Sequence, residues 1–287
     1  STVQRQQQGI SSSVIDRELF IRGAFIALLD LLVLSLAAGK IVLQVLYAIG
    51  VSMMIMVVLR RLGARVLFFA AITIFIGSEF LLMELWEHGG DAPLWLARTF
   101  APVFSTSYSI MYPLIPWLAM MMLGWVFGER LMSKQSNVWP VQRLLMVSGC
   151  VALMLFMLIR GMDGYGNMFM LLEGDSLVQW LHISKYPPSL AYTLLELGLM
   201  AIILAALMRL EKMIRVRSNE PVLLFGQTAL FFYLAHFGVL AVLSLDVSRG
   251  GVKQAYLVAL MGLVILFGLC RSFRSLKWLL PQGIWRF

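Results

Sequence analysis

The sequence has little charge and almost no cysteine, and both shortages narrow the class of protein. Only 13% of the 287 residues are Asp, Glu, Lys or Arg, whereas a soluble domain typically carries about 25%. Cys150 and Cys270 lie inside apolar runs without a paired or metal-type spacing. The sequence therefore gives no argument for a disulfide framework, and we expect both cysteines to be buried thiols that pack as small hydrophobic groups.

The small share of charged residues is matched by a large share of hydrophobic residues. They account for 60% of the chain, and the mean hydropathy is +0.86. One compact core of this length cannot cover so much apolar surface, so the solvent for most of the chain must be the lipid bilayer. The composition predicts an integral membrane protein.

The net charge of +8 comes from basic residues in short connections between apolar runs. That distribution is typical of cytoplasmic loops beside anionic lipid, whereas a nucleic-acid site gathers basic residues on one soluble face. We therefore expect no nucleic-acid partner. The sequence also lacks a Walker loop, a Gly-x-Ser-x-Gly elbow and a His-Glu-x-x-His pattern, and no metal is implied.

Eight apolar runs are long enough to cross a bilayer, which takes about 20 residues in a helix. Their approximate bounds are 19–39, 41–60, 64–85, 108–128, 142–160, 188–208, 222–245 and 252–270. Backbone polar groups cannot stay unpaired in lipid, and no alternating barrel pattern is present. The predicted fold is an all-α, polytopic transmembrane helix bundle of about eight spans.

Basic residues fall mainly in alternate connections, which orients the bundle. The predicted cytoplasmic set is Arg5, Arg17, Arg22, Arg60, Arg61, Arg65, Arg130, Lys134, Arg143, Arg209, Lys212, Arg215, Arg217, Arg271, Arg274, Lys277 and Arg286. The opposite side has Lys40, Arg98, Arg160, Lys185, Arg249 and Lys253. Both termini are thus expected in the cytoplasm, in a multi-pass protein of the inner (cytoplasmic) membrane. The expected organisation is a polar segment (1–18), a transmembrane bundle (19–270) and a cytoplasmic tail (271–287).

Two long, acidic connections, 86–107 and 161–187, lie on the predicted outer side. Either the polar chemistry takes place there, or these connections only cover helix ends. The second connection begins just after Arg160 and contains Asp163 and three glycines between 161 and 166. Arg160 and Asp163 could pair with each other or with a ligand.

Ionisable residues inside apolar runs are a further group of candidates. Asp30, Glu79 and Glu196 fall within predicted spans, where a charge is costly and must face the bundle interior, a partner or water. They could line a site or a proton path, or act as hydrogen-bonded packing residues. His236, near the middle of the seventh run, could be an acid or base or a structural hydrogen-bonding group.

Two proline-containing segments begin predicted spans on the outer side. The first, 112–117, reads Tyr-Pro-Leu-Ile-Pro-Trp, and the second, 185–189, reads Lys-Tyr-Pro-Pro-Ser. Proline fixes φ and costs little in the first turn of a helix, so both segments predict rigid helix entries. Lys185 could hold an anionic or carbonyl oxygen, or could anchor the helix at the membrane surface.

Several of these segments, taken in order, resemble one known family. The motifs are Phe20–Gly23 with Leu43–Gly50, Tyr112–Trp117 followed by Gly124 and Gly128, Arg160-Gly161 with Tyr165-Gly166, Lys185–Leu190, Phe231–His236, and Cys270-Arg271 with Phe273 and Lys277. This order is similar to that in bacterial relatives of heparan-α-glucosaminide N-acetyltransferase, a transmembrane acyltransferase family. The resemblance covers nearly the whole chain.

The resemblance implies a transfer reaction across the membrane. Acetyl-CoA would be the co-substrate on the cytoplasmic side, and an amino sugar or other glycan would be the acceptor on the far side. Cytoplasmic arginines would hold the CoA phosphates, a role that suits guanidinium groups. The expected cofactor-binding residues are Arg22, Arg60, Arg61 and Arg271.

The first span departs from the family pattern. Family members begin with two further spans that carry Asp-x-x-Arg-Gly and then the catalytic histidine. Here Asp16 and Arg22 are six apart and no histidine follows in that span. We therefore expect the leading helices to be missing or supplied elsewhere, in a truncated, split or processed product. The catalytic assignment stays open among His236, Lys185, Asp163 and Glu196.

Three functions remain compatible with the sequence. The first is an acetyl-CoA-dependent membrane acyltransferase, either active or inactive through the missing helices. The second is a non-catalytic, acyltransferase-derived subunit that joins other membrane subunits in a larger complex. The third is a transporter, suggested by the intramembrane acids Asp30, Glu79 and Glu196.

Overall fold

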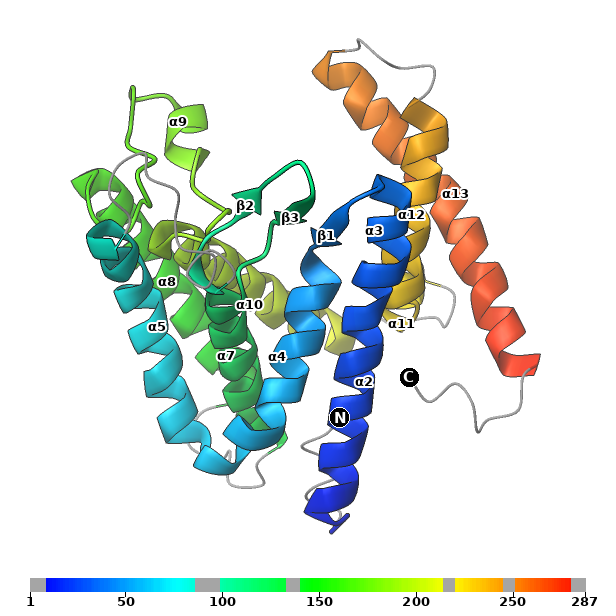
Figure 1. The fold of residues 1–287 in the computed structure, drawn as a ribbon. Helices are drawn as coiled ribbons and strands as arrows, with labels where there is room; N and C mark the ends of the chain where they lie inside the picture. Colours follow the sequence, from blue (N-terminus) through cyan, green and yellow to red (C-terminus); the bar gives the residue numbers. More distant parts are fainter. Residues whose placement is uncertain (1–8, 86–98, 133–139, 214–219, 245–250, 280–287) are drawn as a thin grey trace. The chain divides into compact units, whose positions relative to one another are not determined.

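The computed structural model describes residues 9–85, 99–132, 140–213, 220–244 and 251–279, and these residues are mainly helical (Figure 1). Two compact units divide the chain, unit 1 at Ser1–Arg209 and unit 2 at Leu210–Phe287. The helices of unit 1 are α2 (Ser12–Leu29), α3 (Ser35–Ala38), α4 (Val45–Leu59), α5 (Ala64–Leu85), α7 (Leu114–Met132), α8 (Val141–Met162), α9 (Leu177–Leu181) and α10 (Leu190–Met213), the last of which continues past the division. A π-helical turn (Asp30–Leu34) joins α2 to α3, and a 3-10 turn (Arg60–Leu62) ends α4. Unit 2 contains α11 (Pro221–Gln227), α12 (Ala229–Ser244) and α13 (Val252–Leu279).

The membrane prediction is confirmed by the lengths and composition of these helices. In the described residues seven helices are long and apolar enough to cross a bilayer, and the number is eight if the bent pair α11 and α12 forms one span. The predicted all-α bundle of about eight spans is therefore correct. The cytoplasmic placement of both termini and the division at residues 18 and 270 stay predictions.

Two predicted span starts are wrong, because residues 41–43 and 108–110 form strands. A small sheet has the order β1 (Ile41–Leu43), β3 (Tyr108–Ile110), β2 (Val103–Phe104). β1 runs parallel to β3, with Ile41 opposite Tyr108, and β2 runs antiparallel to it. Pro113 disfavours helical geometry at the residue before it, so the fourth span begins only at Leu114. The sheet pairs backbone groups that a helix would otherwise satisfy.

The seventh predicted run, 222–245, is broken rather than continuous. α11 and α12 meet at an angle of 99°. At the break, the Thr228 Oγ1 hydroxyl donates to the Leu224 carbonyl oxygen at 2.8 Å. Side-chain hydrogen bonds of this kind compete with regular helix geometry, and no proline marked the break in advance.

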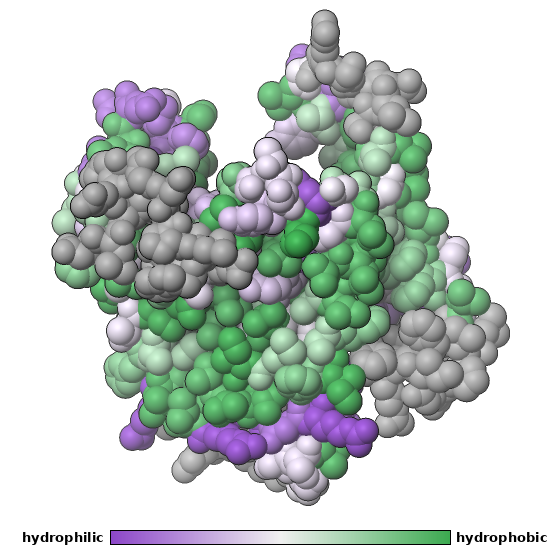
Figure 2. Space-filling model, viewed as in Figure 1, coloured by the Kyte–Doolittle hydropathy of each residue, from purple (hydrophilic) through white to green (hydrophobic). Residues whose placement is uncertain are grey.

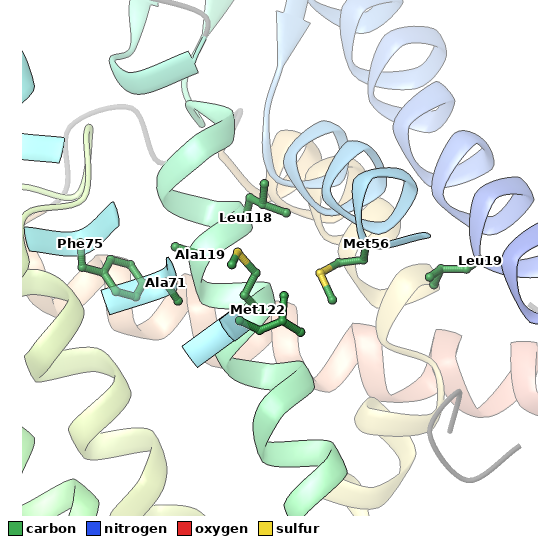
Figure 3. Packing of buried hydrophobic residues seen from close by; sticks show 8 residues of the cluster. Leu19, Met56, Ala71, Phe75, Leu118, Ala119 and Met122 are labelled. Atoms are coloured by element: carbon green, nitrogen blue, oxygen red, sulfur yellow. The ribbon is translucent and has the colours of Figure 1, made fainter. Parts of the chain in front are cut away.

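The core of unit 1 is a seam of apolar side chains shared by four helices (Figure 3). Met56 of α4 lies between Leu19 of α2 and Leu118 of α7, while Phe75 extends the seam along α5. All four side chains are at most 8% exposed. In lipid such packing stabilises through close van der Waals contact rather than through removal from water. The cluster therefore joins α2, α4, α5 and α7 into one packed layer.

Glycines allow α2 and α4 to cross at close range. A Cβ placed on Gly23 would lie 2.6 Å from the Gly50 carbonyl oxygen, and one placed on Gly50 would overlap the Gly23 carbonyl oxygen. Small residues at such a crossing let helix backbones approach closely in membranes. Because the atoms in the way belong to the backbone, they cannot move aside as a flexible side chain would. The crossing therefore depends on glycine at both positions.

Asp30 is a buried acid with a structural use. Its side chain is fully buried, and its Oδ2 accepts hydrogen bonds from the backbone N–H groups of Gln44 (2.8 Å) and Tyr47 (2.7 Å). These donors lie at the start of α4, where helical N–H groups have no partner in the helix. Asp30 of the first span therefore caps the second span.

Glu79 and Arg160 also form hydrogen bonds with backbone groups, in the connection that follows α8. Glu79 Oε1 accepts from the Met168 backbone N–H at 2.8 Å. Arg160, fully buried at the end of α8, donates to Asn167 Oδ1 and to four backbone carbonyl oxygens. The carbonyls belong to Met170, Gln179, Trp180 and His182. A single guanidinium thus fixes the course of residues 167–182.

The surface of unit 1 has the polarity of a membrane protein. Figure 2 shows a hydrophobic band over its helices, with hydrophilic residues at the end where α4 is followed by α5. Arg17, Arg61 and Arg65 are exposed at this end, which the loop charges predict to be cytoplasmic.

Replacing Gly50 with Ala should separate α2 from α4, because the added Cβ overlaps the Gly23 carbonyl oxygen. Overpacking of this kind costs about 1–3 kcal/mol. A lowered midpoint of thermal unfolding in detergent would show it. The matched control is Gly77→Ala in α5, where an added Cβ meets no atom within 4 Å. Equal midpoints for the two variants would contradict the close crossing.

Replacing Arg160 with Met should destabilise the outer connection by at least about 3 kcal/mol, because each orphaned buried acceptor costs about 1–3 kcal/mol. Hydrogen exchange over residues 167–182 should accelerate together with the loss of thermal stability. The control is Arg209→Met, since Arg209 is exposed on α10. Unchanged exchange in the Arg160 variant would show that the connection is held by other contacts.

Candidate functional site

The two proline-containing entries converge at the outer end of unit 1. Tyr112, just before α7, and Tyr186, just before α10, place their phenolic oxygens 3.0 Å apart in a hydrogen bond. Their rings lie edge to face with centroids 5.2 Å apart. Tyr112 is buried and Tyr186 is half-buried. The rigid entry angles that the prolines impose therefore bring together two segments that are far apart in the sequence.

A cation and a tryptophan complete the aromatic part of this site. The Lys185 Nζ lies 5.3 Å from the Tyr186 ring centroid and 5.9 Å from that of Tyr112, within the range of cation–π attraction. The side chain of Lys185 remains exposed. The Trp117 ring lies 4.8 Å from that of Tyr112, and its Nε1 is buried with no partner among the described residues.

The first two turns of α10 add an acid. Tyr192 is close enough to Glu196 and Tyr186 to interact with both electrostatically. Glu196 is exposed, although it lies inside an apolar helix. We name the set Tyr112, Trp117, Lys185, Tyr186, Tyr192 and Glu196 the outer cluster.

The outer cluster combines three chemical functions. Tyrosine and tryptophan offer flat apolar faces with polar edges, which suits the mixed surface of a sugar ring. Lys185 offers a positive charge for a carboxylate or a developing oxyanion. Glu196 offers a carboxylate that can take a proton. Two of the predicted catalytic candidates, Lys185 and Glu196, thus belong to one cluster.

Asp163 is placed differently from these two. It ends α8 in a left-handed conformation with φ of 47°, and its Oδ1 accepts the Leu172 backbone N–H at 2.6 Å. Within the described residues Arg160 and Asp163 form no salt bridge with each other, because each side chain bonds the connection itself. The expected pairing with a ligand stays a prediction. Asp163 shapes the backbone next to the site.

Tyr165 follows on the same turn and ties it to α5. Its hydroxyl donates to the Ile76 carbonyl oxygen. Partial burial raises the pKa of the Tyr165 phenol, and the nearby Glu79 carboxylate raises it further. Tyr165 therefore stays a protonated donor at neutral pH, and its role is to hold the connection against α5.

His236 lies in unit 2, on α12. Its Nδ1 contacts the Tyr233 carbonyl oxygen, and its ring packs against Phe237 with centroids 4.1 Å apart. These contacts fit the structural alternative in which the histidine forms a local hydrogen bond. Both of these neighbours come from its own helix.

A second charged cluster forms at the opposite end of unit 1. Asp16 Oδ1 accepts from Arg60 Nε at 2.9 Å, and Asp16 Oδ2 accepts from an Arg61 terminal nitrogen at 2.7 Å. Arg60 is buried, with 3% of its side chain exposed, whereas Arg61 is 65% exposed. We name Asp16, Arg60 and Arg61 the inner cluster. Two predicted CoA-binding arginines thus lie side by side, with different access to solvent.

Of the other two predicted CoA-binding arginines, Arg22 is half-buried on α2, and Arg271 is exposed on α13 of unit 2. Arg17 and Arg65 are exposed at the same end of unit 1 as the inner cluster. The sequence analysis did not predict that Asp16 pairs with Arg60 and Arg61. The available signal was an acidic residue near the start of the first helix, on the same predicted side as these two arginines.

Metal chemistry finds no support in the described ranges, since no three His, Cys, Asp or Glu side chains there are placed to hold an ion. The two cysteines are both free. Cys270 is buried as expected, whereas the expectation of burial is wrong for Cys150, which is exposed on α8.

Replacing Arg60 with Ala should cost about 3 kcal/mol of stability, because it leaves the Asp16 carboxylate at a packed position without its main partner. Replacing Arg61 with Ala should cost less than about 1 kcal/mol, because exposed ion pairs contribute little. Thermal unfolding of both variants under one detergent condition compares them directly. Equal losses would show that burial does not distinguish the two arginines.

Comparison with known proteins gives one match. A sequence model of the family described as "Heparan-alpha-glucosaminide N-acetyltransferase, catalytic" matches residues 1–160, more than half of the 287 residues. No curated protein and no solved structure matches the chain. The matched region includes most of α8 and the helices before it, and therefore the inner cluster together with Tyr112 and Trp117 of the outer cluster.

Proposed function

The chain belongs to the heparan-alpha-glucosaminide N-acetyltransferase family, and from this membership we propose that it transfers an acetyl group across the membrane. The donor is acetyl-CoA on the cytoplasmic side, and the acceptor is a sugar or glycan on the far side. The family match over residues 1–160 carries the proposal. It supports a membrane acyltransferase-like function, to which the two clusters of unit 1 add a donor end and an acceptor end.

The inner cluster supplies the donor end. Arg61 is largely exposed, and only one of its terminal nitrogens contacts Asp16. Its remaining N–H groups can bind a CoA phosphate, for which the planar guanidinium is suited. Arg17 and Arg65, exposed at the same end, would add positive charge. Arg60 is the positioning residue, because it holds Asp16 from a buried site.

The outer cluster supplies the acceptor end. The tyrosine and tryptophan faces hold the sugar, and Glu196 takes the proton from the attacking amine or hydroxyl. Lys185 stabilises the oxyanion that forms on the acetyl carbon. The thioester C–S bond breaks at the donor end, where a carrier takes the acetyl group and CoA leaves as a thiolate that is then protonated. At the outer cluster the new C–N or C–O bond forms as the bond between the acetyl group and the carrier breaks, and the carrier leaves with that electron pair.

The carrier of the acetyl group between the two ends has no assigned residue. The family pattern places a histidine in a preceding span, and none of the unit 1 spans contains a histidine. The second candidate function is a non-catalytic subunit that works with other membrane chains. The transporter hypothesis loses its motivation at Asp30 and Glu79, because both carboxylates bind backbone N–H groups.

The proposed location is the inner (cytoplasmic) membrane, with both chain ends in the cytoplasm. The helices support a multi-pass protein in a bilayer, and the alternate basic connections support the orientation. In this orientation the inner cluster faces the cytoplasmic pool of acetyl-CoA, and the outer cluster faces the compartment that contains envelope glycans.

Replacing Glu196 with Gln should lower kcat at least about tenfold, because a general base typically contributes about 10²–10⁴ in rate. The assay uses the complete natural protein in liposomes, with radiolabelled acetyl-CoA outside and glucosamine inside, and then with the sides reversed. Glu211→Gln, at the other end of α10, is the matched control.

In the same assay, Arg61→Ala should raise KM for acetyl-CoA, and Lys185→Met should lower kcat.

Isothermal titration of the same protein with acetyl-CoA separates the two candidate functions. Binding that weakens in the Arg61 variant supports the acyltransferase. No binding at millimolar acetyl-CoA, together with membrane subunits that copurify in fixed proportion, would overturn it in favour of the non-catalytic subunit.

A further inference from the structure

Four helices of unit 1 enclose an apolar groove that neither cluster uses. Its volume is about 590 Å³, within the usual range of about 300–1,000 Å³ for ligand sites. Its walls come from α5, α7, α8 and α10, and among the lining residues are Phe68, Ile76, Leu123, Leu155 and Leu197. Only Ser148 and Thr193 contribute hydroxyl groups to the lining.

The groove is elongated along the spans. On α10 its lining extends from Leu190 to Ala201, and on α5 from Phe68 to Ile76. At 1.5 Å per residue these stretches measure about 16 Å and about 12 Å. Both helices are long and apolar enough to be spans, so the groove runs along the spans for about half of the thickness of a hydrocarbon core.

Thr193 places one polar group in this apolar lining. It lies in the first turn of α10, at the outer end, and is 3% exposed. Its Oγ1 is buried without a hydrogen-bond partner among the described residues. A buried unpaired hydroxyl is costly. Ser148, deeper in the groove, donates to the Leu145 carbonyl oxygen at 3.1 Å, so Thr193 is the lining hydroxyl that lacks a partner.

The chemistry of the groove selects among possible occupants. Water needs two to four polar partners, and the lining does not provide them. A sugar or a nucleotide would leave many polar groups unpaired. A hydrocarbon chain matches the apolar walls and the elongated form, and the bilayer supplies it at that depth. An ester carbonyl at the head of such a chain would accept the hydrogen bond that Thr193 Oγ1 can donate.

We propose that this groove binds one ester-linked acyl chain of a glycerophospholipid from the outer leaflet. The ester carbonyl oxygen bonds Thr193 Oγ1, and the chain extends past Leu197 and Leu155 toward Phe68. Ester groups lie at the edge of the hydrocarbon core, which is where the first turn of α10 begins. The site is independent of acetyl transfer, because it involves neither cluster.

Photolabelling tests the position of the chain. The complete protein is placed in phosphatidylcholine vesicles that carry a trace of the same lipid with a diazirine in the middle of one acyl chain. Labels should concentrate on groove residues such as Leu155 and Leu197. Leu155→Trp, which fills the groove, should lower this labelling severalfold, whereas Met154→Trp should not. Met154 lies on the same helix, is 63% exposed and does not line the groove.

The ester contact has its own test. The wild-type protein should prefer the photoactivatable ester lipid to its ether-linked analogue by roughly three- to tenfold, the effect of one hydrogen bond. Thr193→Val should abolish the preference, and Thr193→Ser should retain it, which separates the hydroxyl from a general packing effect.

Two outcomes would overturn the proposal. One is labelling spread evenly over all lipid-facing residues of α5 and α8, which would indicate ordinary annular lipid. The other is equal labelling by the ester and ether lipids in the wild-type protein. Acetyl-transfer activity is measured alongside, and its loss or retention in these variants changes neither conclusion.

Discussion

The fold of unit 1 depends on pairing backbone groups at its predicted outer end, where helices stop and their backbone groups lose their partners within the helix. Unpaired N–H and C=O groups are costly in lipid. Asp30, Glu79 and Arg160 meet the requirement from inside the spans, two as acceptors and one as a donor. A charged side chain and an unpaired backbone group are each costly in lipid, and a hydrogen bond between them removes both costs. This exchange explains why charged residues occur inside the spans of a chain that has so few.

Both clusters rest on that framework. Arg160 and Glu79 fix the connection that leads to Lys185 and Tyr186, and Asp30 fixes the start of α4, whose far end carries Arg60 and Arg61. The same helices therefore join the two polar ends through an apolar interior. In the proposed reaction this geometry keeps the CoA phosphates and the acceptor in separate compartments, and the acetyl group alone has to move between them.

Much of this structure was predictable from hydropathy and proline positions. The spans follow from run lengths, and the two stiff helix entries follow from Pro113, Pro116, Pro187 and Pro188. The contact between these entries at Tyr112 and Tyr186 was found only in the structure. The sheet and the bend at Thr228 were not predictable, because strand pairing and side-chain competition depend on partners outside the local sequence. The sequence likewise identified the acidic residues inside the spans, but it did not identify the backbone N–H groups that bind them, because these groups lie far away in the sequence. Lys185 and Glu196 were named singly, and only the fold places them together.

In the proposed reaction, the link between Asp16 and Arg61 has a consequence for turnover. Arg61 already has a counter-ion in the protein, so a CoA phosphate would exchange with a carboxylate and would not meet an isolated cation. Exchange gives a smaller net gain than capture of a bare charge, and the carboxylate remains nearby through its bonds to Arg60. The proposed CoA product would therefore leave readily, because the Asp16 carboxylate is at hand to replace it. Loose binding of a bulky, highly charged product would speed each cycle.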